Sequence, residues 1–186
     1  MSNIIKAIQE IYPDIKGGYA YWESRFDGTP LEKPEDGLVW ENKEYEKPLW
    51  VDIEDKLKIV ELKQVKEEKL VEIQTAKEID LYLNVSYNNK DFISSEKAVS
   101  NMTGAIILDQ DDYNWLDANG NPNIMTVNDL RNLIGIIATQ RSLIYNKEAL
   151  KIKAVNDSQT IEEVSNINWK DNLSLGRKTK KTIKSI

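Results

Sequence analysis

The segment from Leu83 to Trp169 carries turn and helix-cap signals at nearly every step, and this order constrains the fold more than any other feature. It predicts a hairpin, a short helix, a second hairpin about Asn119-Gly120, a long helix and a last capped turn. Asn-Gly between two strand-like runs is a strong hairpin signal, because both residues tolerate positive φ. We therefore expect one self-contained module here.

The first hairpin and the first helix of this module follow from spacing. Apolar and polar residues alternate from Leu83 to Tyr87, and Asn88-Asn89 then supplies a turn that tolerates positive φ. A serine, Ser94 or Ser95, caps the next helix. Its apolar face contains Ala98, Val99, Met102, Ala105 and Ile106. Gly104, in the middle of this helix, suggests the close approach of another element.

Two further helix starts show the capping-box arrangement. Thr126 precedes Asp129 by three residues, and Thr160 stands in the same relation to Glu163. The helix that starts at Thr126 has a broad apolar stripe, formed by Leu130, Leu133, Ile134, Ile137 and Ile144. The shorter helix is followed by Ile167 and Trp169. Both starts are therefore fixed by local hydrogen bonding.

Residues 1–50 follow a different pattern. Ile4, Ile5, Ile8 and Ile11 form one face of a helix that Pro13 ends. Short aromatic runs then alternate with Gly- and Pro-containing turns, and we expect strands at 19–22 and 38–40. The aromatic residues of these runs either line a ligand groove, as in carbohydrate- or Pro-rich-peptide-binding modules, or form the core of a small domain: Tyr19, Tyr21, Trp22 and Trp40.

Residues 51–82 form a long helix candidate, because good helix formers run through it without Gly or Pro. A helix of this length would be roughly 45 Å long. The spacing of Ile53, Leu57 and Val60 continues at Gln64, Glu67 and Val71, so no heptad lasts. We expect a linking helix, with homo-oligomerisation through it as an open alternative.

The predicted fold class is α+β. We expect a small N-terminal aromatic-rich α/β module at 1–50, the long helix at 51–82, a C-terminal domain of two hairpins packed on amphipathic helices at 83–169, and a basic tail at 170–186. The tail carries six basic residues against Asp171, whereas the chain as a whole has a net charge of −6. The tail is either a solvated terminus or a clamp on an acidic protein surface. We expect neither nucleic acid nor a membrane as a partner.

Composition excludes several kinds of chemistry. The chain has no cysteine and no histidine, which excludes thiolate sites, His-ligated metals and Ser-His triads. The acids around Asp109–Asp112 and Asp117 look calcium-like, but an EF-hand counted from Asp117 would place Pro122 and Asn128 where Gly and Glu are needed. No Gly-rich phosphate loop is present. We therefore expect no enzyme, no cofactor and no bound metal.

Four runs of the module, with helices between them, resemble a phage-encoded domain found in tail-fibre-associated and tail-fibre-assembly proteins: Val85–Phe92, Tyr113–Gly120, Met125–Leu130 and Thr160–Trp169. That domain typically has an x-N/D-G-K-x-F hairpin, an x-x-W strand, a T-x-x-D/E-L helix start and a closing V-x-x-I-x-W. Asn89 stands where Gly is usual. Trp40-Glu-Asn and Lys47–Trp50 are similar to leader modules of small phage tail proteins.

The resemblance implies a non-enzymatic bacteriophage tail protein. Such a protein is either a chaperone that assembles a tail fibre or adhesin in the host cytoplasm, or a structural component of the virion tail. The predicted contact residues are Trp115, Trp169, Leu133 and Ile137, with core packing as the alternative. Two other functions remain open: a receptor- or glycan-binding module that uses Trp22 and Trp40, and a self-associating coiled-coil connector built on residues 51–82.

Overall fold

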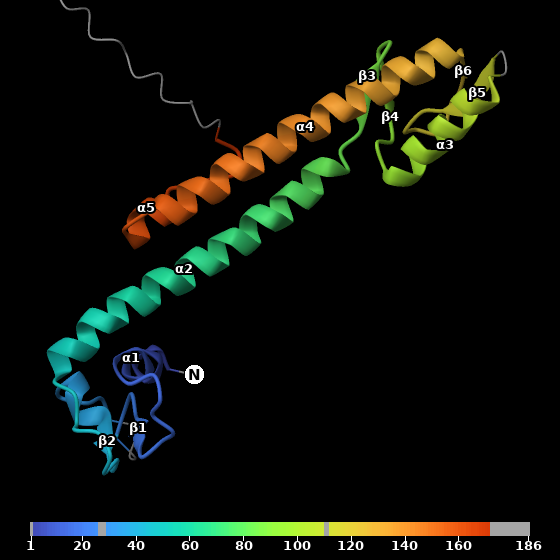
Figure 1. Ribbon diagram of the computed structural model, residues 1–186. Helices are drawn as coiled ribbons and strands as arrows, with labels where there is room; N and C mark the ends of the chain where they lie inside the picture. The colour runs from blue at the N-terminus through green and yellow to red at the C-terminus, as the bar shows by residue number, and fades with distance from the viewer. Residues whose placement is uncertain (1, 26–28, 110–111, 172–186) are drawn as a thin grey trace, which may run out of the picture. The chain divides into compact units, whose positions relative to one another are not determined.

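The computed structural model describes residues 2–25, 29–109 and 112–171 of the 186. Within these ranges the chain is α+β, as predicted, with two long helices and three two-stranded antiparallel hairpins (Figure 1). The N-terminal aromatic cluster is also confirmed. The predicted basic tail lies outside the described residues from residue 172 onward.

The chain forms two compact units. Unit 1 consists of Met1–Glu68 with Ser158–Ser165, and unit 2 consists of Lys69–Asp157 with Asn166–Ile186, each for its described residues. The long helix α2, Trp50–Leu81, contributes to both. Its bounds lie within one residue of the range predicted from composition. In unit 1 this helix buries Ile53 and Val60.

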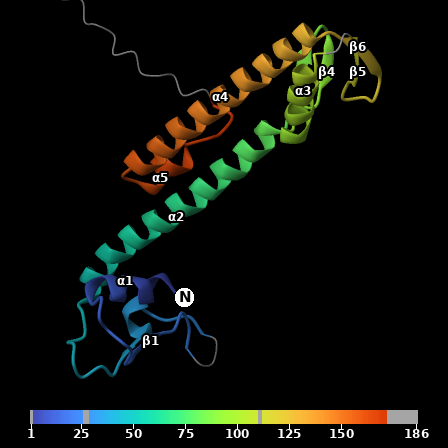
Figure 2. The ribbon, with the colours of Figure 1, turned by 45° about the vertical axis from the view of Figure 1, so that its right-hand side comes forward.

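Unit 1 is built on a short capped helix and one small hairpin. Helix α1, Asn3–Ile11, begins because the Ser2 side chain accepts a hydrogen bond from the Ile4 backbone amide. It lies beside strand β1 (Tyr19–Tyr21) and the first turns of α2 (Figures 1 and 2). Strand β1 pairs with β2 (Leu38–Trp40), which the short 3₁₀ helix η1 (Pro34–Gly37) precedes. Helix α5, Ile161–Ser165, completes the unit.

Two glycines of unit 1 are required by its backbone. Gly18 has φ +77°, and a Cβ there would lie 2.9 Å from the Asn42 Cα atom. A Cβ on Gly37 would lie 2.2 Å from the Trp22 carbonyl oxygen. No side chain fits either position without a backbone shift, so both glycines are explained by the fold of unit 1 itself.

Both hairpins of unit 2 turn where the sequence predicts. Strands β3 (Val85–Tyr87) and β4 (Lys90–Phe92) are joined by Asn88 and Asn89, whose φ values are 50° and 60°. Two consecutive positive φ values are the requirement of a type I′ turn. Strands β5 (Tyr113–Leu116) and β6 (Pro122–Met125) are joined by residues 117–121.

Asp117 organises the second of these turns. Its side chain accepts hydrogen bonds from the backbone amides of Asn119 and Asn121, both at 2.9 Å. The hydrogen bond from the Asn121 backbone is the largest cause of the lowered pKa of this carboxyl, and it outweighs the opposing effect of burial. Turn geometry therefore accounts for this acid, while residues 110–111 of the neighbouring acidic run lie outside the described ranges.

The helices of unit 2 enclose its core. Helix α3, Glu96–Leu108, is capped by the Ser95 side chain, and α4, Val127–Asp157, starts at the predicted Thr126–Asp129 capping box. The two helices pack together over both hairpins, with Val85, Phe92, Met102, Met125, Leu130, Leu133 and Ile137 buried between them. The predicted apolar faces of both helices are thus the faces that the core uses.

One expectation about this core was wrong. We predicted that Gly104 marks the close approach of another element, yet a Cβ added there would meet no atom of the described chain within 4 Å. Gly135, in the middle of α4, has the same open surroundings. A mid-helix glycine costs about 1 kcal/mol relative to alanine. Neither cost is explained by packing within the described residues.

Candidate interaction surfaces

Trp169 fastens the last described segment to the end of α2 within unit 2. Its indole Nε1 donates a 2.7 Å hydrogen bond to the Asp80 carboxylate, which also lies 3.7 Å from the Lys147 ammonium. The same ammonium lies over the indole ring at 4.3 Å from its centroid. Because Trp169 is only 6% exposed, this predicted contact residue is part of an intramolecular clasp.

A second ion pair joins α2 and α4 next to this clasp. Lys77 lies 3.1 Å from Glu148 and 3.3 Å from Glu78, and its side chain is only 10% exposed. Burial lowers the pKa of Lys77, but hydrogen bonds and charge from Glu148 and Glu78 outweigh burial and raise it above the ordinary value. Specific polar pairs therefore join the two helices.

Lys151 lies in the same part of α4 and is almost completely buried. Burial lowers the pKa of its ammonium, the charge of Asp171 opposes that shift, and the like charge of Lys147 adds to it. Three lysines of unit 2 therefore have different electrostatic surroundings: Lys77 lies between two glutamates, Lys147 lies beside Asp80 and Trp169, and Lys151 is buried.

A groove runs along the accessible side of α4. It is shallow and open, has a volume of about 1010 Å³, and is bordered at one end by Tyr87 of β3 and at the other by Asp80 of α2. Its floor consists of two parallel rows of every fourth residue of α4: Arg131, Gly135, Thr139, Leu143 and Lys147, and Asn132, Ile136, Gln140 and Ile144. We call it the α4 groove. Apolar residues lie at its middle and basic residues at its ends.

A separate apolar surface covers the end of α3 and the outer face of the β5–β6 hairpin. Ile107, Leu108, Leu116 and Ile124 are between 58% and 76% exposed, and we call them the contact patch. In the register of the hairpin, Leu116 lies opposite Pro122 and Ile124 opposite Asn114, so the outward positions alternate with inward ones.

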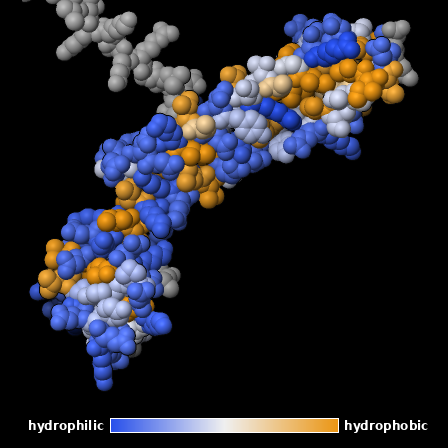
Figure 3. All heavy atoms as spheres, viewed as in Figure 1, coloured by the Kyte–Doolittle hydropathy of each residue, from blue (hydrophilic) through white to orange (hydrophobic). Residues whose placement is uncertain are grey.

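The two elements that carry the contact patch, α3 and the β5–β6 hairpin, are neighbours. The Tyr113 hydroxyl of β5 donates a hydrogen bond to the Ala105 carbonyl of α3. Figure 3 shows apolar residues gathered over this end of unit 2. Gly104 lies three and four residues before Ile107 and Leu108, on the same side of α3. Exposed apolar groups of this kind usually mark a protein-interaction surface.

The other predicted contact residues of unit 2 lie in its core. Leu133 is fully buried, Ile137 is 2% exposed, and Trp115 packs half-buried against the same cluster. The exposed large apolar side chains of α4 are Ile136, Leu143 and Tyr145 instead. Sequence could not separate these sets, because a broad stripe on a helix gives no sign of where the neighbouring elements stop.

The predicted N-terminal residues have two different environments. Trp40 packs against Tyr12 and Tyr19, and its indole donates to the Tyr45 carbonyl, so it belongs to the core of unit 1. Trp22 is 52% exposed, beside a hollow that Arg25 and Asp36 also line. The strand alternates, so Tyr19 and Tyr21 face the core while Trp22 does not. Burial, followed by the charge of Glu23, raises the pKa of Tyr21.

No protein-family model matches the chain, and neither does any curated protein or solved structure. None of the helices in the described ranges is long and apolar enough to cross a membrane. The structure adds two surfaces that sequence did not single out, namely the contact patch and the α4 groove. For the contact patch, the signal in the sequence is aliphatic residues that lie outside the predicted helical stripes, such as Ile107 and Ile124.

Proposed function

We propose that this protein is a non-enzymatic bacteriophage tail protein that assists the assembly of a tail fibre or adhesin, or stays bound to it as a structural component. The sequence resemblance of residues 83–169 to a phage tail-fibre-associated domain supports this function. The observation that carries it is the contact patch, since four exposed aliphatic side chains on a small unit require a protein partner more than they require a reaction.

The partner in this proposal is the tail fibre or adhesin itself. A chaperone of this kind would act in the host cytoplasm during assembly, whereas a structural component would remain in the virion tail. An unfolded or partly assembled fibre exposes apolar segments that the patch would cover. Because no catalytic group is needed, activity would depend on shape and apolar contact alone.

Co-expression with the adjacent fibre gene tests this proposal. We expect the chain to raise the yield of soluble trimeric fibre, and Leu108→Glu or Ile124→Glu to remove that gain by placing a charge in the contact. Leu49→Glu is the matched control, because Leu49 of unit 1 is 68% exposed and Leu108 is 67% exposed. An unchanged fibre yield with the wild-type chain would refute the assembly function.

A receptor- or glycan-binding module is the second candidate, and half-exposed Trp22 beside Arg25 and Asp36 favours it. In that case the purified chain binds host cells by itself, and Trp22→Ala abolishes adhesion. Trp40→Ala is less informative, since Trp40 is a core residue. The third candidate, a coiled-coil connector built on α2, predicts oligomers of a peptide spanning residues 51–85 in light scattering.

A further inference from the structure

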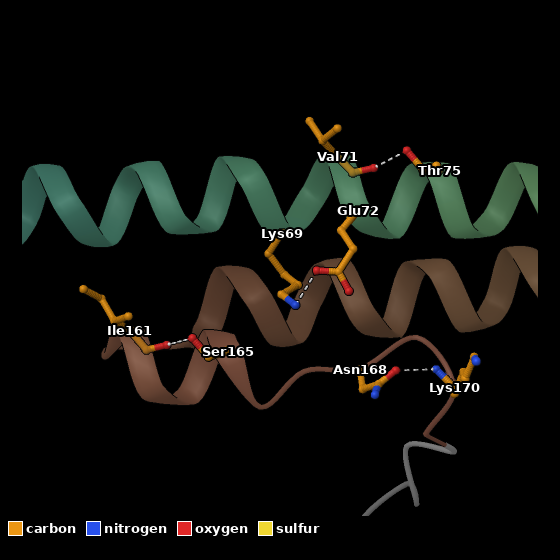
Figure 4. A network of polar contacts seen from close by, with 8 residues as sticks. All are labelled: Lys69, Val71, Glu72, Thr75, Ile161, Ser165, Asn168 and Lys170. Carbon is orange, nitrogen blue, oxygen red and sulfur yellow. Dashed lines mark hydrogen bonds and ion pairs between the residues drawn. The ribbon is translucent and has the colours of Figure 1, made fainter. Parts of the chain in front are cut away.

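One row on the accessible face of α2 in unit 2 carries two exposed apolar side chains and a threonine. Val71, Thr75 and Ile79 occupy every fourth position of the helix, and we call this row the α2 ridge. Val71 is 67% exposed and Ile79 is 62% exposed. In Figure 4, Val71 and Thr75 point away from α4, whereas Lys69 and Glu72 lie on the side that faces it. The ridge is therefore not used by the described core of unit 2.

The α2 ridge and the α4 groove have matching geometry. Both are rows of every fourth residue, and rows of this type interlock in the commonest class of helix packing, with a crossing angle of about −50°. Gly135 and Thr139 lie at the middle of the groove, where a small side chain allows another helix to approach closely. This contact would account for Gly135, whose surroundings in the described chain leave it unexplained.

The polar atoms at the centre of both rows are already satisfied. The Thr75 hydroxyl donates to the Val71 carbonyl at 2.9 Å (Figure 4), and the Thr139 hydroxyl donates to the Gly135 carbonyl at the same distance. Covering these residues would therefore leave no hydroxyl without a hydrogen bond, and only their methyl groups face outward. The polar cost of covering the two threonines is therefore reduced, because each hydroxyl keeps its donor hydrogen bond within its own helix.

Charge is also complementary. Glu78 flanks the ridge with a side chain 48% exposed, and Lys77 beside it is shared with Glu148, so this group of three keeps one net negative charge. Arg131 lies at one end of the groove, whereas Lys147 at the other end is already paired with Asp80. The whole chain is acidic, so two copies repel each other unless basic and acidic surfaces meet locally.

We propose that the partner of the α4 groove is a second copy of this chain, whose α2 ridge packs into it. Such a contact joins two different surfaces, so it generates a closed ring or an open chain of copies rather than a symmetric pair. The inference does not rest on the proposed function, because the contact patch is separate from both rows. Failure of the fibre experiment would leave it standing.

Light scattering on the full chain provides the first test. We expect a mass that rises with concentration above the 21.4 kDa of one copy. Ile79→Glu or Leu143→Glu should each reduce assembly to monomers, and Ile124→Glu, an equally drastic change at an exposed position outside both rows, should not. Mixing the two disrupted variants should restore a one-to-one pair through the remaining intact ridge and groove. A wild-type chain that stays monomeric at every concentration overturns the proposal.

Disulfide trapping gives the second test, because the natural chain has no cysteine. Ile79→Cys mixed with Leu143→Cys should cross-link into mixed dimers faster than Ile79→Cys mixed with Ile124→Cys. These exposed substitutions leave the core intact, so misfolding does not confuse the result. Equal rates would overturn the proposal. Predominant Ile79–Ile79 cross-links would overturn it in favour of a symmetric contact between α2 helices.

Discussion

Leu133→Ala and Leu143→Ala make the same chemical change on one helix, and the structure predicts very different costs. Leu133 is 0% exposed in the core of unit 2, whereas Leu143 is 65% exposed. Removing a buried leucine costs the lost transfer energy plus the cavity term, about 3 kcal/mol within a usual range of 2–5. The exposed change should cost less than about 0.5 kcal/mol, because alanine is the better helix former.

Thermal unfolding followed by far-ultraviolet circular dichroism measures both costs. A loss of about 3 kcal/mol lowers the Tm of a unit of roughly 100 residues by about 12–24 °C, while the exposed change should shift it by no more than about 4 °C. The measurement is made at a dilution at which light scattering gives the mass of the monomer. This is necessary because Leu143 lies in the α4 groove, where the proposed association would also affect stability. Equal shifts for the two variants would refute the assignment of core and surface on α4.

Substitutions at three other places test other parts of the structure. Gly135→Ala should stabilise the monomer by about 1 kcal/mol, whereas Gly37→Ala should destabilise it by more than that, as denaturant midpoints would show. The capping box lowers the pKa of Asp129. The contribution of the ionised carboxylate to the free energy of unfolding is therefore complete above pH 3.8, the ordinary pKa, and is lost as the pH falls through the lowered pKa. The difference in unfolding free energy between wild type and Asp129→Asn should therefore shrink below pH 3.8; a constant difference contradicts the shift. Trp169→Phe should cost about 2 kcal/mol by removing the donor to Asp80, and an unchanged midpoint would contradict the clasp.

Local chemistry explains why much of the fold could be predicted. The Asn88-Asn89 turn and the Thr126–Asp129 capping box depend on residues at most three positions apart. The hydrogen bonds of that box, with Thr126 as the first partner and Tyr87 as a further one, also cause the lowered pKa of Asp129. Such features can be predicted from a single sequence because no distant residue is needed to form them.

The interaction surfaces were harder to predict because they depend on distant neighbours. Trp169 and Asp80 are 89 positions apart, so the sequence around Trp169 gives no sign that its indole has a partner within the chain. Lys77 and Glu148 are likewise paired across two helices. On α4, Leu133 and Leu143 differ only in what covers them, and the apolar pattern alone cannot report that. The same ambiguity made Gly104 suggest a neighbour that the described chain does not contain.

Hydrogen–deuterium exchange of the full chain, alone and with a candidate tail-fibre or adhesin protein, shows which part of this protein a partner covers. Binding through unit 2 should slow exchange in peptides from residues 103–108 and 113–125, which carry the contact patch. Peptides from 19–25, which contain Trp22, should be unaffected. Protection confined to that N-terminal segment, or no protection anywhere, would contradict the claim that this protein works by contact through unit 2.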